Sequence, residues 1–96
     1  MSLNSALDNS IIVASQNQIS SDLTDETIIL DLKSGQYYGL NAVASSVWNF
    51  IQQPRKVEEI RSHLMAEYEV NMQECSNDLQ ILIRNLASKG LVELVN

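Results

Sequence analysis

Few residues in this sequence could carry out nucleophilic or acid–base chemistry. Cys75 is the only cysteine and His63 is the only histidine. Apolar residues at helical spacing place the Cys75 thiol in a buried stripe, where desolvation raises a thiol's pKa and makes it a poor nucleophile. His63 falls toward the solvent side of its predicted helix and needs no function of its own. We therefore predict no catalytic residue and no enzyme activity.

Metal and cofactor sites are also poorly supported. One cysteine and one histidine cannot close a zinc site without several carboxylates. The adjacent acids Glu58 and Glu59 fall in the first turn of a predicted helix, where they complement the helix dipole. That role is more common for such a pair than general acid–base catalysis. The three glycines are isolated and form no phosphate-binding loop, so we expect no metal and no cofactor.

Length and charge exclude further classes. A chain of 96 residues forms one domain, assigned to residues 11–96, after a flexible lead-in rich in serine and asparagine at residues 1–10. The net charge is −6, which repels phosphate backbones, so no nucleic-acid partner is expected. No apolar run approaches the roughly 18 residues of a membrane span. With a single cysteine and no signal-peptide pattern, the predicted location is the cytoplasm.

The elements that would position any functional residue begin with strands. Residues 11–13 form a short extended segment that we expect to lie against the core. Residues 18–23 form a weak strand, with Ile19 and Leu23 expected to point inward. Residues 27–32 (TIILDL) form a stronger, β-branched strand.

A hairpin leads to the third strand of the predicted sheet. Residues 33–36 form its turn, with Gly35 available for a positive φ. Residues 37–40 (YYGL) form the strand itself, in which the rings of Tyr37 and Tyr38 must point to opposite faces. Because consecutive hairpins make a meander, this strand is expected at an edge of the sheet.

Three helices follow the sheet. They are predicted at residues 42–52, with Asn41 as N-cap, at residues 57–68, and between an Asn71 cap and Gly90. Residues 91–95 are predicted to form a short final strand or an extended tail. The apolar face of the first helix comprises Val43, Ala44, Val47, Trp48, Phe50 and Ile51. That of the third comprises Met72, Cys75, Leu79, Leu82, Ile83 and Leu86. Strands followed by helices predict an α+β fold, here a winged helix-turn-helix-like shape with a three-stranded antiparallel sheet followed by three helices.

A winged-helix shape keeps a DNA-binding regulator as the alternative function. The recognition helix would then be the third helix. Its exposed side carries two acids, Glu74 and Asp78, against one central arginine, Arg84. Phosphate contacts would be few, so the charge argues against this alternative.

Two features are not explained by the core. Ile81 projects away from the apolar stripe of the third helix, although one exposed isoleucine is common. The other feature is the YYGL edge strand, whose free backbone groups can pair with an extended peptide. If the third helix flanks this strand, the two form a groove with a polar rim and an apolar floor. From these residues alone, a docking site and a blunted edge with a core tyrosine are equally supported.

Four segments together resemble the PqqD-like family, the small recognition domains of ribosomally made peptide biosynthesis. They are ETIILDLKSGQYYGLNAVASSVWNFI, VEEIRSHLMAEYEV, ECSNDLQILIRNL and KGLVEL. The resemblance covers residues 18–94, and the order and spacing of the segments are more specific than any one of them. One departure is Lys56, where a helix-capping Thr or Ser is typical.

The resemblance implies a function and a site. The expected function is non-catalytic recognition of a precursor's leader peptide, which docks as an added strand and is presented to a processing enzyme. That enzyme would be a leader peptidase, a cyclase or a radical enzyme. The chain looks most like the stand-alone leader-binding proteins of lasso-peptide biosynthesis, and its free strand edge would also allow a homodimer. The implied peptide-binding residues are Gln36, Tyr37, Tyr38, Gly39 and Leu40 on the strand and Asp78, Ile81, Leu82 and Asn85 on the helix.

Overall fold

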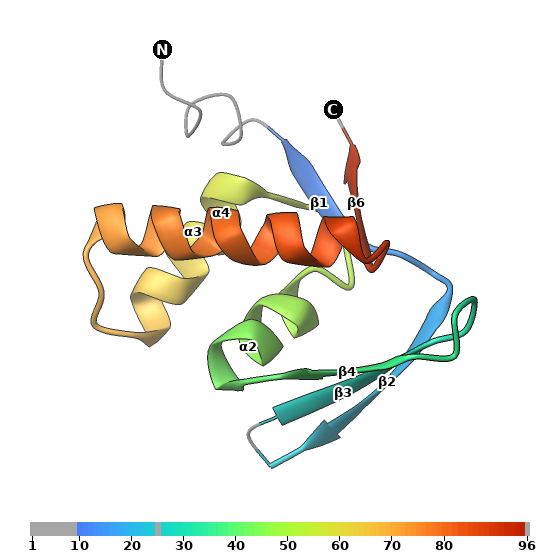
Figure 1. Ribbon diagram of the computed structural model, residues 1–96. Coiled ribbons are helices and arrows are strands. Elements are labelled where there is room, and N and C mark those ends of the chain that lie inside the picture. The colour runs from blue at the N-terminus through green and yellow to red at the C-terminus, as the bar shows by residue number, and fades with distance from the viewer. Residues whose placement is uncertain (1–9, 25, 96) are drawn as a thin grey trace.

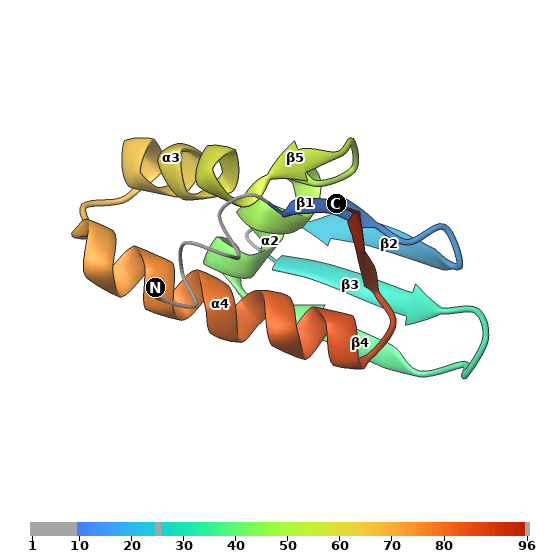
Figure 2. The same ribbon diagram turned by 90° about the horizontal axis from the view of Figure 1, so that it is seen from above.

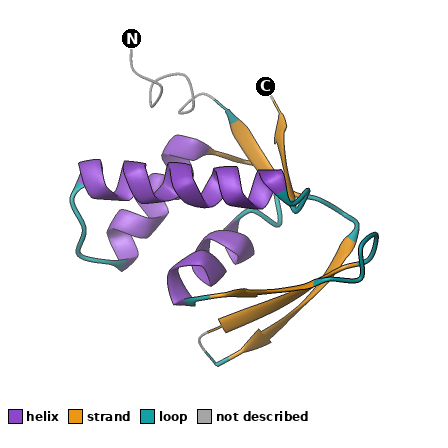
Figure 3. Ribbon diagram, in the orientation of Figure 1, coloured by secondary structure: helices purple, strands orange, loops and turns teal. Residues whose placement is uncertain are grey.

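The computed structural model describes residues 10–24 and 26–95. Apart from Ser10, the predicted lead-in lies outside these residues. The described elements form two small sheets and three helices (Figures 1 and 3). The α+β class and the winged helix-turn-helix-like arrangement are thereby confirmed. No helix in this part of the chain combines the length and apolarity needed to cross a bilayer.

The first sheet is the predicted antiparallel meander. It consists of β2 (Gln18–Leu23), β3 (Glu26–Asp31) and β4 (Tyr37–Leu40) in the order β2-β3-β4. β4 is therefore an edge strand, as predicted. β3 begins and ends one residue earlier than expected, and Leu32 is left in the turn with 55% of its surface exposed.

The prediction that Ile19 and Leu23 point inward was wrong. Their side chains are 58% and 56% exposed. Ile19 pairs with Leu30, so both lie on the face of the sheet opposite to Ile29. Ile29 is fully buried on the face that α2 covers, whereas no residue of β2 is buried.

A second sheet joins the two ends of the described chain. It consists of β5 (Arg55–Lys56), β1 (Ile11–Ala14) and β6 (Val92–Val95) in the order β5-β1-β6. The extended segment near residue 12 was predicted, and a strand was one of the two expectations for residues 91–95, but the pairing of the two was not predicted. Ile12 is fully buried beneath this sheet.

The helices are α2 (Ala42–Phe50), α3 (Val57–Glu67) and α4 (Met72–Ser88). Their caps follow the prediction: the Asn41 side chain accepts a hydrogen bond from the Ala44 N–H, and the Asn71 side chain accepts one from the Glu74 N–H. Gly90 ends α4 with φ of +72°.

The start of α3 shows how Lys56 serves as an N-cap. Its side chain offers no acceptor, but its own N–H donates to the Glu59 carboxylate at 2.8 Å. One of the two bonds of a capping box is thus made.

The core lies between the helices and the two sheets. The Cys75, Leu79, Ile83 and Leu86 side chains of α4 are buried there, as expected, whereas Met72 is 62% exposed. Met72 lies in the first turn of α4, at the end of the molecule where the α3–α4 connection turns (Figure 1). The largest fully buried side chains are Trp48, Ile12, Ile29, Ile51, Ile60, Leu79 and Leu91.

Candidate functional site

The turn before β4 is fixed by a network around Asp31. The Gly35 N–H donates to the Asp31 carbonyl at 2.7 Å, and the Asp31 N–H donates to the Gln36 carbonyl at 2.9 Å. With Gly35 at φ +74°, this is the pattern of a G1 β-bulge. The Asp31 carboxylate also accepts bonds from the Lys33 N–H and the Ser34 hydroxyl, each at 3.0 Å. The strand that follows is therefore held in a defined register.

That register determines which backbone groups of β4 are free. Hydrogen-bonded and non-hydrogen-bonded pairs alternate along an antiparallel ladder. Counting from the bulge, Tyr38 opposite Ile29 is a hydrogen-bonded pair, and Tyr37 and Gly39 occupy non-hydrogen-bonded positions. The N–H and C=O groups of Tyr37 and Gly39 therefore point to the open edge, where an added strand could pair with them.

The two tyrosines lie on opposite faces, as predicted. Tyr38 shares the face of Ile29 and packs half-buried against the core, and its hydroxyl donates to the Gln36 side chain at 2.8 Å. Tyr37 lies on the outer face and is 70% exposed. Leu40, at the end of the strand, is buried in the core.

α4 flanks this edge. It passes above β4 in Figure 1, and seen from above its C-terminal part overlaps β4 (Figure 2). The Lys89 ammonium lies 5.2 Å from the centre of the Tyr38 ring, within the range of a cation–π contact. The C-terminal end of α4 therefore lies beside the first half of β4.

A cavity of about 290 Å³ opens between α4 and the start of α2. Its polar rim is formed by Asn41 and Asp78. Its apolar lining comprises Val43, Ala44, Leu64, Leu79 and Leu82. We call the open edge of β4, this cavity and the facing side of α4 the edge groove.

The structure brings most of the residues implied by the resemblance to the edge groove. Asp78 and Leu82 line the cavity, and Asn85 is exposed three residues beyond Leu82 on the same side of α4. Ile81 is 59% exposed and lies on the next flank of the helix, outside the cavity lining. Leu40 supports the edge from the core and offers no surface to a ligand.

Sequence reasoning missed other residues of the groove. Val43 was assigned to the core face of its helix, but it is 41% exposed because the first turn of α2 borders the cavity. Lys89 was interpreted only as the last residue before Gly90. Its spacing of eleven residues from Asp78 places the two on one side of a helix, and this signal could have identified it.

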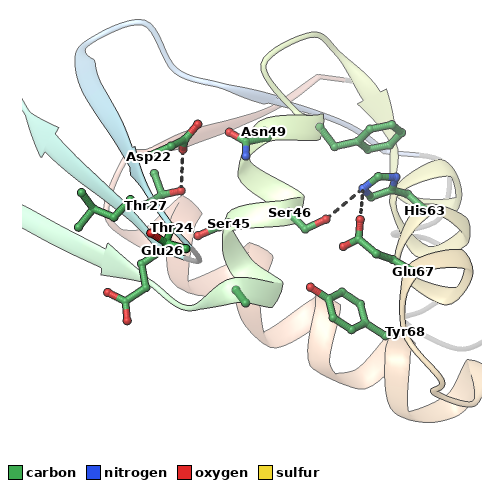
Figure 4. A pocket seen from close by; sticks show the side chains of 13 residues that line it. Asp22, Thr24, Glu26, Thr27, Ser45, Ser46, Asn49, His63, Glu67 and Tyr68 are labelled. Carbon is green, nitrogen blue, oxygen red and sulfur yellow. Dashed lines mark hydrogen bonds and ion pairs between the residues drawn. The ribbon is translucent and has the colours of Figure 1, made fainter.

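A second, polar cleft of about 580 Å³ lies between the β2–β3 connection, α2 and α3 (Figure 4). His63 is half-buried there, contrary to the expected solvent position. Its ring stacks on Phe50 with centroids 4.3 Å apart. The Ser46 hydroxyl lies 3.0 Å from His63 Nε2, and the Glu67 carboxylate lies 3.8 Å from the same nitrogen. A nucleophilic triad needs the acid at the other ring nitrogen, so this arrangement links α2 to α3 and does not activate a serine.

Cys75 is a structural residue, as predicted. Its side chain is 4% exposed, and burial raises the pKa of the thiol above the ordinary value of 9.0. The thiol lies 3.8 Å from the Arg61 carbonyl oxygen, to which it donates. No cluster of three or more His, Cys, Asp or Glu residues that could hold a metal ion occurs in residues 10–24 and 26–95.

The fold and the edge groove define a small α+β binding domain with an open sheet edge beside a helix. This chain belongs to the PqqD family: the family model described as coenzyme PQQ synthesis protein D matches residues 26–92. No curated protein sequence matches the chain.

Two solved structures are similar to it. The first, TbiB1 in complex with the TbiA(beta) leader peptide, is 36% identical with a TM-score of 0.80, and the alignment covers 84% of this chain and 94% of that one. The second, a lasso peptide synthetase B1 complexed with the leader peptide, shares the fold with 21% identity and a TM-score of 0.75 over 85% of this chain and 96% of that one.

Proposed function

We propose that this protein binds the leader segment of a ribosomally made precursor peptide in the edge groove and presents it to a processing enzyme, without catalysing a reaction itself. The observation that carries the proposal is the 36% identical structure of TbiB1, which is a complex with a leader peptide. The open edge of β4 in this chain supports it independently, because Tyr37 and Gly39 offer unpaired backbone groups.

Strand addition supplies the first part of the binding energy. Each backbone hydrogen bond formed at the edge contributes about 0.5–1.5 kcal/mol net. Tyr37 and Gly39 offer two donors and two acceptors, and the peptide backbone supplies the matching groups. This contribution depends little on the peptide's sequence, so it gives affinity more than selectivity.

Side chains of the peptide supply the second part. Alternate residues of an added strand point to the α4 side, toward the cavity lined by Val43, Leu79 and Leu82. Burying one large apolar side chain there contributes about 1.5–3 kcal/mol. The proposed contact residues are Gln36, Tyr37, Tyr38, Gly39, Asp78, Ile81, Leu82 and Asn85, and Leu40 supports the strand from the core.

We also propose the type of biosynthesis in which the protein acts, its partner enzyme and its location in the cell. The similarity to TbiB1 supports a role in lasso-peptide biosynthesis, with a separate leader peptidase as the processing enzyme. Precursors are made on ribosomes, so the proposed location is the cytoplasm. Without a peptide, the open edge would be available to a second copy of the chain.

The direct test uses fluorescein-labelled leaders of the short precursors encoded next to this protein's gene, with the TbiA(beta) leader as a second probe. Fluorescence anisotropy measures binding to the wild type and to the Tyr37→Asp and Ile81→Glu variants. Both positions are more than half exposed, so the fold should tolerate either change. We expect each to weaken binding about tenfold or more, which corresponds to about 1.4 kcal/mol.

Leu94→Glu is the matched control, because Leu94 is 45% exposed on β6 in the other sheet. It introduces the same charge away from the groove and should leave the affinity unchanged. Equal affinity of wild type, Tyr37→Asp and Ile81→Glu for a peptide that binds would contradict the groove assignment.

A further inference from the structure

One side of α4 carries an acidic residue near the middle of the helix, Asp78, and a basic residue at its C-terminal end, Lys89. Asp78, Leu82, Asn85 and Lys89 are spaced by four, three and four residues, so at about 100° per residue they form one stripe along the helix. Asp78 lines the cavity together with Asn41, which directly follows β4. Lys89 lies over Tyr38, near the start of β4. The helix therefore runs opposite to the strand, with the negative charge at Asp78 and the positive charge at Lys89.

Neighbouring side chains do not neutralise these two charges. In the described part of the chain neither Asp78 nor Lys89 takes part in an ion pair. Eleven residues of helix separate Asp78 from Lys89 by about 16 Å. This exceeds the screening length of about 8 Å at physiological salt, so each charge acts on its own end of a bound ligand.

The geometry of an added strand converts this separation into a sequence spacing. An extended peptide rises about 3.3 Å per residue, so about five residues span the distance between the two charges. β2, β3 and β4 are antiparallel throughout, and an added strand that continues this pattern runs antiparallel to β4. Its N-terminal end then lies beside Asp78 and its C-terminal end beside Lys89.

We propose that the edge groove selects peptide segments that carry a basic residue followed, about four or six positions later, by an acidic residue, with Asp78 and Lys89 as the residues that read them; the even spacing keeps both peptide side chains on the α4 side. The proposal rests on the function proposed above and specifies which peptides that function serves. Between the two charges, the neutral Leu82 and Asn85 leave the centre of the segment to apolar and amide contacts.

The test is a selection from a displayed library of random peptides of about twelve residues, long enough to span the groove. The baits are the wild type, the double variant Asp78→Lys with Lys89→Glu, and the double variant Lys56→Glu with Glu93→Lys. The last is a matched control, because it exchanges one exposed basic and one exposed acidic residue on β5 and β6. Wild type and control should enrich basic-then-acidic sequences, and the Asp78/Lys89 variant should enrich the reverse order.

A second measurement separates recognition from folding, because Lys89 caps the C-terminal end of α4. The wild type and Lys89→Gln are each titrated with a selected peptide and with its analogue in which the acidic residue is replaced by an amide. Lys89→Gln should weaken binding of the acidic peptide about two- to fivefold, the range for an exposed ion pair, and leave the analogue unaffected.

Failure of the charge selection can be distinguished from failure of leader binding. A charge-free consensus, or the same charge order for the wild type and the Asp78/Lys89 variant, would overturn the inference and leave leader binding standing. If no bait enriched any peptide and the neighbouring leaders did not bind either, the proposed function itself would fall.

Discussion

Val43 and Lys89 show why single residues of the groove escape sequence reasoning. The helical pattern gives the direction of a side chain around its axis, but not how far along that axis the core extends. Val43 has the right direction for burial and lies one turn beyond the covered region, so it borders a cavity instead. Lys89 could be assigned to a helix end from sequence, yet its contact with Tyr38 depends on how α4 crosses β4.

Cys75 provides a test at the residue scale. Because burial raises its pKa, the native thiol should react slowly with a disulfide reagent at about pH 8, where an exposed cysteine is partly ionised. Unfolding in urea should restore a fast reaction. Absorbance of the released thiolate follows both rates, and a native rate equal to the unfolded one would contradict the buried position.

The raised pKa of Cys75 also determines in which direction the free energy of unfolding changes with pH. The folded protein holds the Cys75 proton more tightly than the unfolded chain, so this group favours folding less as the pH rises past the unfolded pKa. The contribution is complete below the ordinary thiol pKa of 9.0 and is lost as the pH rises through the higher pKa of the folded state. Cys75→Ala should therefore show a smaller loss of stability than the wild type between neutral and alkaline urea titrations.

At the scale of elements, local signals were sufficient for most predictions. Asn41 and Asn71 mark helix starts, and Gly35 and Gly90 mark the turns, because each residue satisfies a requirement of its own few neighbours. Pairing across the chain has no such signal. β1 and β6 pair across nearly the whole sequence, through Ile12 opposite Leu94, so their contact follows from the packed core.

Two substitutions at Gly39 test whether a peptide pairs with the free edge of β4. Gly39 has no close neighbour at the position of an added Cβ, where the nearest atom, Ile28 Cδ1, lies at 3.8 Å. Gly39→Ala should therefore keep both fold and peptide binding. Gly39→Pro removes the outward N–H, a change that edge strands tolerate, and should weaken binding about two- to tenfold through one lost hydrogen bond.

Anisotropy titration of both variants with one labelled leader measures the difference, and thermal unfolding checks that each is folded. Equal binding by Gly39→Pro and Gly39→Ala would show that the peptide does not pair with this edge.

At the scale of the whole molecule, one small core supports both sheets, and a bound strand would add to the β2-β3-β4 sheet at the open edge of β4. The chain has 96 residues and a net charge of −6, which suits a peptide ligand better than a polyanion. The negative net charge argues against a nucleic-acid partner from the sequence alone. It could not position the groove, which depends on the crossing of α4 over the sheet.

Peptide binding should raise the stability of the whole domain. A leader at about 100 times its Kd adds about 2.7 kcal/mol to the free energy of unfolding. For a domain of this size, the unfolding midpoint should rise by about 10 to 20 °C. Differential scanning fluorimetry with the leader and a scrambled control measures this. An equal midpoint with both peptides, at saturating concentration, would contradict specific binding to the folded state.

The bulge at Gly35 and the bonds around Asp31 have a kinetic consequence. They hold the edge of β4 in its binding register before any peptide arrives, so the protein has little ordering left to do during an encounter. The flexible partner bears that entropic cost, and matched and mismatched leaders should meet the edge at similar rates. Discrimination would then reside in how long each leader stays. The dwell time of the complex, compared with the arrival time of the processing enzyme, would decide which precursors mature.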